Sequence, residues 1–228
     1  MISKLMRFWS EERSLSVFLS LLVIHMFVIG PVMRAGLALA IASGLLLSIL
    51  LVAGVAMVVR HPALQWTAGM FVLLAIVVHW AGTVWGTPSL LFWNAVLTLL
   101  VTVGFLLIVL WWVYREGPVT GHRVRGAVAA YLLLALCFSF SYDLTEYVHP
   151  DSFTLPLGGA EGMQTRSASF LYFSVVTLTT VGFGDIAAVH PVARSLVMVE
   201  ALVGALYPAI LLARIVTLQM ETRRSQRS

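Results

Sequence analysis

The stretch Thr179-Thr180-Val181-Gly182-Phe183-Gly184-Asp185 decides what fold this chain can adopt. It follows directly on an apolar run at 167–179, which is shorter than the about 20 residues that a membrane-spanning helix needs. Non-helical backbone at membrane depth is tolerated only where it is buried in protein or lines a water-filled path. Gly182 and Gly184 permit the left-handed backbone angles with which a loop turns successive carbonyls toward one axis. The stretch therefore predicts a pore loop, with Val181 and Phe183 packed behind it.

The composition around this loop is that of a membrane protein. Of the 228 residues 60% are hydrophobic and 11% are charged, and the mean hydropathy is +0.97. A soluble domain carries about 25% charged residues, so soluble enzymes are excluded. The net charge of +4 does not indicate nucleic acid as a partner, because Lys and Arg are not clustered with aromatic residues between them. Cys137 is the only cysteine and cannot form an intrachain disulfide.

The gaps between charged residues predict an all-α membrane protein with six transmembrane helices, a re-entrant pore helix and a filter loop. Eleven of the 14 Lys and Arg residues then fall on one side, which places both termini in the cytosol and the chain in the plasma or inner membrane. A signal peptide is the alternative for the first span, but the apolar sequence continues past Ala38-Leu39-Ala40. The predicted spans are about 15–33, 35–59, 63–85, 90–114, 126–142 and 192–218, with a loop at 143–166. The predicted domains are a cytosolic N-terminus at 1–14, a four-helix region at 15–114, a pore domain at 120–219 and a basic cytosolic tail at 220–228.

The loop sequence resembles the selectivity filter of the tetrameric potassium channels, whose usual form is Thr-Val-Gly-Tyr-Gly. Phe183 replaces the tyrosine, so a hydroxyl that could tie the loop to the helix behind it is missing. The resemblance implies that Thr180, Val181, Gly182 and Phe183 supply the oxygens that bind K⁺, and that Asp185 lies at the outer mouth after Gly184. It covers about 126–218 and implies a homotetramer, because a single loop cannot surround an ion.

Two residues of the last span are predicted to form a gating hinge. Pro208 frees the carbonyl of Gly204, and together they are expected to bend the helix. The alternative is that Gly204 only permits close helix packing. By the family pattern, Ala205, Pro208 and Leu212 line an apolar cavity.

Glu200 in the middle of the last span is a further candidate, because an intramembrane carboxylate is expensive unless it is paired or hydrated. A hydrogen bond from Ser174 or Thr177 either tunes the filter or simply satisfies Glu200, and the sequence favours neither interpretation. Val176 stands where some relatives carry a glutamate that pairs with the residue equivalent to Asp185, so that pair cannot form here.

The predicted function is passive, K⁺-selective conduction, with no enzymatic activity and no cofactor besides the K⁺ ions in the filter. The expected partners are K⁺, membrane lipids and further copies of the chain. A weakly selective cation channel is the alternative within this class, and a secondary transporter or an intramembrane hydrolase is the alternative outside it. The fourth span carries no positive charge, which predicts weak voltage dependence. Acidic residues outside are expected to form a vestibule that attracts cations: Asp143, Glu146, Asp151, Glu161 and Asp185. The alternative is an ordinary solvated loop.

Overall fold

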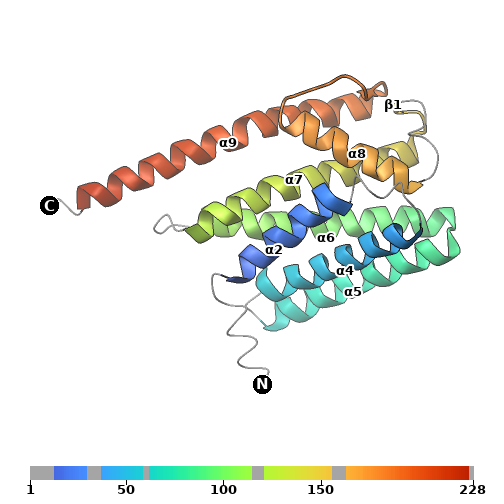
Figure 1. Cartoon of the computed structure of the whole chain (residues 1–228), viewed down its shortest axis with the longest axis horizontal. Coiled ribbons are helices and arrows are strands. Elements are labelled where there is room, and N and C mark those ends of the chain that lie inside the picture. Colours follow the sequence, from blue (N-terminus) through green and yellow to red (C-terminus); the bar gives the residue numbers. More distant parts are fainter. Residues whose placement is uncertain (1–12, 30–36, 59–61, 115–120, 156–162, 226–228) are drawn as a thin grey trace.

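The computed structural model describes residues 13–29, 37–58, 62–114, 121–155 and 163–225 (Figure 1). The first part of the chain consists of α2 (Arg13–Val23), a π-helix η1 (Ile24–Ile29) that continues it, α4 (Leu37–Val58), α5 (Pro62–Trp85) and α6 (Pro88–Tyr114). The second part consists of α7 (Gly121–Val148), β1 (Phe153–Thr154), α8 (Met163–Leu178), β2 (Ala187–Ala188) and α9 (Pro191–Ser225).

Proline and glycine set the ends of several of these helices. α5, α6 and α9 each begin at a proline, whose fixed φ suits the first turn and whose missing N–H is not needed there. α5 ends at Trp85, and Gly86 follows it with a φ of 60° while its amide donates to the Gly82 carbonyl at 2.9 Å. This left-handed residue closes the helix and allows α6 to start within two residues.

Four helices in the described part of the chain are long and apolar enough to cross a membrane. They are Gln65–Trp85, Ser89–Tyr114, Arg123–Val148 and Pro191–Arg214. The described apolar parts of the first two predicted spans, Leu15–Phe27 and Ile41–Val55, are shorter. The all-α membrane architecture is thus confirmed, whereas the count of six spans stays a prediction, because residues 30–36 and 59–61 lie outside the described residues.

The fifth helix is longer than the predicted 126–142, and the prediction of a loop from Asp143 onward was wrong as far as Val148. Asp143 hydrogen-bonds to Ser167 and lies near Arg166, and the Glu146 carboxylate accepts the amides of Asp151 and Ser152. Because both carboxylates are satisfied within the fold, their charges do not require the helix to stop.

The last helix also runs past its predicted end at 218 and continues through most of the predicted tail to Ser225. The added segment 219–225 contains Gln, Met, one Glu and two Arg, all of them good helix formers. A charged segment can extend a helix into water, so the end of the apolar run did not mark the end of the helix.

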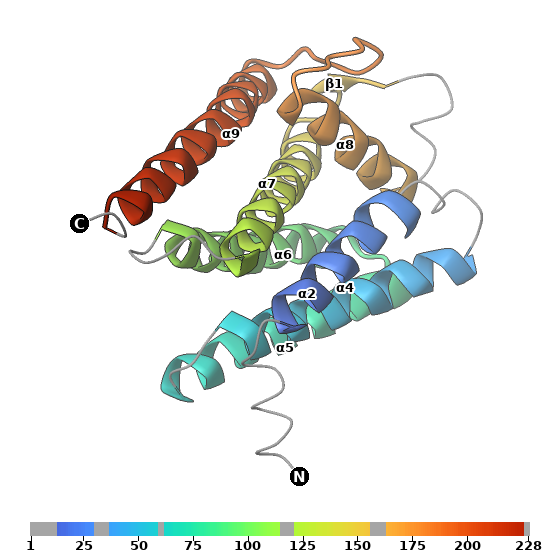
Figure 2. The ribbon, with the colours of Figure 1, turned by 60° about the vertical axis from the view of Figure 1, so that its left-hand side comes forward.

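α8 packs against both α7 and α9, and α9 runs on beyond them as a single long helix (Figure 1). In Figure 2, α6 lies beneath α7, and α4 and α5 form the layer beyond it. The loop after α8 returns across the top of this region and pairs with the segment after α7, since β1 and β2 are antiparallel with Phe153 opposite Ala188.

Two buried clusters hold these helices. The larger one joins the first helices to α7 and includes Phe18, Leu22, Leu50, Phe105 and Leu133. The smaller one is largely aromatic, surrounds the middle of α8, and consists of Tyr142, Phe153, Phe170, Phe173, Ile186 and Ala193. The loop at 179–185 therefore starts from a helix whose middle is packed among aromatic rings.

Candidate functional site

The loop after α8 has an alternating backbone. Thr180, Gly182 and Gly184 have φ angles of 60°, 55° and 79°, and the residues between them are not left-handed. Alternation of left- and right-handed residues directs successive N–H groups to one side and successive carbonyls to the other. The two glycines were expected to take these angles, but Thr180 was not, because a β-branched residue rarely adopts positive φ.

The amides of the loop are held by the pore helix α8. Thr180 donates to the Thr177 carbonyl at 2.9 Å, and Val181 and Gly182 both donate to the Val176 carbonyl, at 3.0 and 3.3 Å. In the described part of the chain, no hydrogen bond ends on a carbonyl of Thr180, Val181, Gly182 or Phe183. Four successive carbonyl oxygens are thus left available on the side opposite α8.

Two apolar side chains of the loop are exposed. Val181 is 53% exposed and Phe183 is 70% exposed in the single chain, so their packing behind the loop stays a prediction. Phe183 only stacks on Tyr172 of α8, with ring centroids 6.4 Å apart and the rings parallel to within 4°. An open cavity of about 400 Å³ separates the loop from α9, with Phe173, Val197 and Ala201 in its wall. No side chain among the described residues fills this space.

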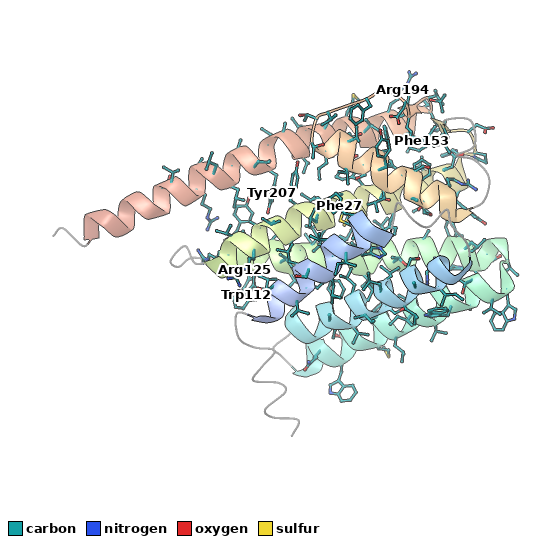
Figure 3. All side chains as sticks on the ribbon, viewed as in Figure 1. Phe27, Trp112, Arg125, Phe153, Arg194 and Tyr207 are labelled. Carbon is teal, nitrogen blue, oxygen red and sulfur yellow. The ribbon has the colours of Figure 1, made fainter. Side chains whose placement is uncertain are left out.

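The outer end of the loop is anchored to α7 and to the segment after it. Val189 donates its amide to the Ser152 carbonyl at 2.9 Å, next to the β1 and β2 pair, and His149 stacks on His190 with centroids 4.4 Å apart. Figure 3 shows Phe153 of β1 and Arg194 of α9 at this same end of the molecule. Asp185 is exposed, and its carboxylate hydrogen-bonds to the Tyr172 side chain.

The predicted acidic vestibule is only partly present. Glu146 is buried and each of its oxygens accepts a loop amide at 3.0 Å, one from Asp151 and one from Ser152. The carboxylate of Glu146 therefore orders the loop and does not face the mouth. Asp151 and Asp185 are exposed, and Glu161 lies outside the described residues.

Glu200 is completely buried between three helices. Its Oε1 lies 2.5 Å from Oγ of Ser174 on α8, and its Oε2 accepts the hydroxyl of Tyr142 on α7. Ser174 was one of the two predicted partners. The other, Thr177, is also buried, but its carbonyl accepts the Thr180 amide, and within the described residues the hydrogen bonds to the Glu200 carboxyl group come from Ser174 and Tyr142. Tyr142 was missed, because nothing in the sequence indicates that a residue 58 positions away faces Glu200.

The predicted hinge residues differ in exposure, with Gly204 buried and Pro208 exposed in the single chain. Gly204 is buried, and a methyl group added there would lie 2.1 Å from the carbonyl oxygen of Leu178, the last residue of α8. This favours the packing interpretation of Gly204. Ala205, Pro208 and Leu212 are exposed in the single chain, and Pro208 lies inside one continuous helix. Bending at Gly204 and cavity lining by the other three stay predictions.

Further hydrogen bonds hold the inner half of this region. Tyr131 donates to the Leu178 carbonyl at 2.9 Å, and Tyr207 donates to the Ala127 carbonyl at 2.9 Å while the two tyrosine rings stack. In Figure 3, Tyr207 points from α9 toward α7. Arg214 donates to the Tyr114 carbonyl and lies over the Tyr114 ring, so the inner part of α9 is tied to the end of α6.

Two histidines of the first helices lie apart from this site. In the described part of the chain, the Nδ1 atoms of His25 in η1 and His79 in α5 are the buried side-chain nitrogen or oxygen atoms without a hydrogen-bond partner. No group of three or more His, Cys, Asp or Glu residues among the described residues is placed to hold a metal ion.

Comparison with known proteins finds a similarity for the second part of the chain. Residues 128–221 match a protein-family model described as "Ion channel". The match covers less than half of the chain and leaves out the first four helices. No curated protein and no solved structure matches the chain. The matched residues 128–221 contain the alternating loop, α8 and most of the helices on both sides of it, so this is the part of the chain that is similar to ion channels.

Proposed function

We propose that this chain is the subunit of a homotetrameric, K⁺-selective channel in which the loop from Thr180 to Gly184 is the filter. The observation that carries the proposal is the alternation of positive φ at Thr180, Gly182 and Gly184, together with four carbonyls that accept no hydrogen bond in the described chain. Carbonyl oxygens arranged in this way replace the water shell of a cation without adding a full negative charge.

The selection of cations over anions follows from the polarity of the loop. The amides of Thr180, Val181 and Gly182 donate to carbonyls of α8, so at these three residues the loop offers its carbonyl oxygens and not its N–H groups to an ion. This arrangement stabilises a cation and repels an anion. The Thr180 hydroxyl adds a further oxygen at the inner end.

Fourfold assembly explains the exposure of the loop. One loop presents its oxygens from one side only, whereas a dehydrated ion needs ligands all around it. Val181 and Phe183 are large apolar side chains that a single chain leaves exposed next to an open cavity, and contact with neighbouring copies would cover them. The exposed face of α9 with Ala205, Pro208 and Leu212 would then line the passage below the filter.

Selectivity for K⁺ depends on how firmly the filter is held. Phe183 has no hydroxyl, so its stacking on Tyr172 and the bond from Tyr172 to Asp185 take over the support of this part of the loop. A loosely held filter would give a weakly selective cation channel. Reversal potentials measured with K⁺ on one side and Na⁺ on the other separate the two functions.

Orientation and surroundings are part of the same proposal. We infer a position in the plasma or inner membrane, with both termini in the cytosol and the chain surrounded by lipid, from the distribution of Lys and Arg. Nothing in the described residues favours the alternatives of a secondary transporter or an intramembrane hydrolase.

The test compares two glycines that share a backbone conformation. Gly182 and Gly86 both have positive φ, near 55° and 60°, and neither has an atom within 4 Å of an added methyl group. Ala in either position carries the same strain, roughly 1–2 kcal/mol. Purified tetramers in liposomes should lose K⁺ tracer flux and its block by Ba²⁺ with Gly182→Ala, and keep both with Gly86→Ala. Equal K⁺ flux through both variants would contradict the proposal.

A further inference from the structure

The cluster of Tyr142, Ser174 and Glu200 contains more short contacts than its hydroxyl protons can supply. The contacts are Tyr142 Oη to Glu200 Oε2, Ser174 Oγ to Glu200 Oε1 at 2.5 Å, and Ser174 Oγ to the Ala135 carbonyl at 2.7 Å. Each contact joins two oxygens, so each needs a proton between them. Tyr142 and Ser174 provide one hydroxyl proton each, and the Ala135 carbonyl provides none.

The third proton has only one place to reside. The Tyr142 proton lies toward Glu200, and the Ser174 proton can serve either the Ala135 carbonyl or Glu200, but not both. If Ser174 donates to the Ala135 carbonyl, Oε1 of Glu200 must itself donate to Ser174. All three contacts are satisfied when Glu200 is a neutral carboxylic acid, and one is left without a proton when it is a carboxylate.

The charges around Glu200 agree with a neutral acid. The ionisable or hydroxyl groups that face it are Tyr142 and Tyr131 from α7 and Ser174 from α8, and its own helix adds none. No Lys, Arg or His in the described part of the chain is among them. A carboxylate that is 0% exposed and has no cation beside it is expensive in this environment.

We propose that Glu200 carries a proton and that, as a neutral acid, it positions the pore helix α8 against α7 and α9. This deepens the proposed function and rests on it for the meaning of α8 as a pore helix. Ser174 lies one turn before Leu178, whose carbonyl is held by Tyr131 and packs against Gly204. α8 is thus attached at two positions one helical turn apart, Ser174 and Leu178. Between them, the carbonyls of Val176 and Thr177 accept the amides of the filter loop.

Loss of the Glu200 proton would weaken the attachment of α8 at Ser174. A charged Glu200 leaves either its contact to Ser174 or that of Ser174 to Ala135 without a proton, and the oxygens then repel each other. Since the neutral form is the one that fits the fold, the attachment of α8 is present at low and neutral pH and weakens as the pH rises. Glu200→Gln keeps one donor for Ser174 and one acceptor for Tyr142 but cannot ionise. Glu200→Ala removes both contacts.

The experiment measures the proton and the position of α8 separately, on the full chain in lipid nanodiscs. Infrared difference spectra of wild type against Glu200→Gln should show the band of a protonated carboxyl group in wild type only. Hydrogen exchange in α8 should be about tenfold faster or more in Glu200→Ala than in wild type, and unchanged in Glu200→Gln. Exchange in α5 serves as the internal control and should not change. Tyr142→Phe, which removes one donor and keeps the ring, should fall between the two Glu200 variants.

Raising the pH completes the test. Wild-type α8 should approach the exchange of Glu200→Ala, whereas Glu200→Gln should not respond. A spectrum with only an ionised carboxylate at Glu200, or α8 exchange in Glu200→Ala and Tyr142→Phe equal to wild type, would overturn the proposal. Absence of K⁺ flux through wild type would contradict the proposed function instead, since neither readout here depends on which ion passes.

Discussion

The first four helices and the region from α7 to α9 are held together in different ways. In the first region, apolar side chains such as Phe18, Leu50 and Phe105 pack into a common core, α5 is joined to α4 by a long hydrogen bond from Trp80 Nε1 to Ser48 Oγ at 3.3 Å, and the buried Nδ1 atoms of His25 and His79 lack partners. In the second region, each helix is joined to the next by hydrogen bonds between residues far apart in sequence. These bonds are Tyr131 to Leu178, Ser174 to Ala135, Tyr142 to Glu200 and Tyr207 to Ala127.

The physical reason for the difference lies in the solvent. Lipid chains are as apolar as Leu side chains, so apolar burial alone specifies weakly which helix packs on which. Hydrogen bonds between helices, and the close approach of two helices at small residues, specify which helices pack together and in which register. A filter loop has to be placed accurately, and the polar contacts are concentrated on the helix that carries it.

The largest effect is expected when the same substitution is made in a close and in an open helix contact. Gly204→Ala would place a methyl group 2.1 Å from the Leu178 carbonyl, a backbone atom that cannot move without α8, whereas Gly104→Ala in α6 has nothing within 4 Å. We expect Gly204→Ala to cost about 3 kcal/mol and to lower Tm in detergent by several degrees. Gly104→Ala should be neutral or stabilise by up to about 1 kcal/mol.

This pair also distinguishes the two roles of Gly204. If Gly204 acts only as a hinge, its alanine variant unfolds at the same temperature as wild type and differs only in channel opening. A Tm equal to that of Gly104→Ala would remove the packing role of Gly204 and restore the hinge as its main function.

A smaller effect is expected from removal of one hydroxyl. Tyr131→Phe keeps the stacking on Tyr207 but leaves the buried Leu178 carbonyl without its donor, which should cost about 1 kcal/mol. Thr83→Val in α5 removes only an exposed bond to the Trp80 carbonyl of its own helix and should change stability by less than about 0.5 kcal/mol. Chemical or thermal unfolding of both variants checks the difference. Equal losses would show that the two regions depend on hydrogen bonds alike.

The smallest effect is expected when the membrane potential is changed and the conductance is measured. α6 carries no charged side chain between Pro88 and Tyr114, and charge that moves in the field is worth about 2.3 kcal/mol per 100 mV for each elementary charge. Conductance should therefore vary little with membrane potential, and no gating current should precede opening. Planar-bilayer recordings at a series of voltages check this, and a steep, saturating charge movement would assign a sensor role to the first region.

Much of the fold and part of the site could be predicted from the sequence. The apolar runs identified the long helices α5, α6, α7 and α9, because exclusion of charge is a local property. The ends of α7 and α9 could not be placed, since Asp143 and Glu146 are satisfied by residues beyond the helix and the tail of α9 is helical although charged. The glycines of the loop were found from sequence, but the left-handed Thr180 was not, because hydrogen bonds to α8 impose its conformation.

The sequence by itself determined the all-α membrane architecture and the similarity of residues 128–221 to ion channels, since composition, span length and a short glycine motif are all properties of neighbouring residues. Only the tertiary structure decided that Tyr142 faces Glu200, that Gly204 meets the Leu178 carbonyl, and that Val181 and Phe183 stay uncovered in one chain. These contacts join residues on different helices, and the register between helices depends on how all their side chains fit at once.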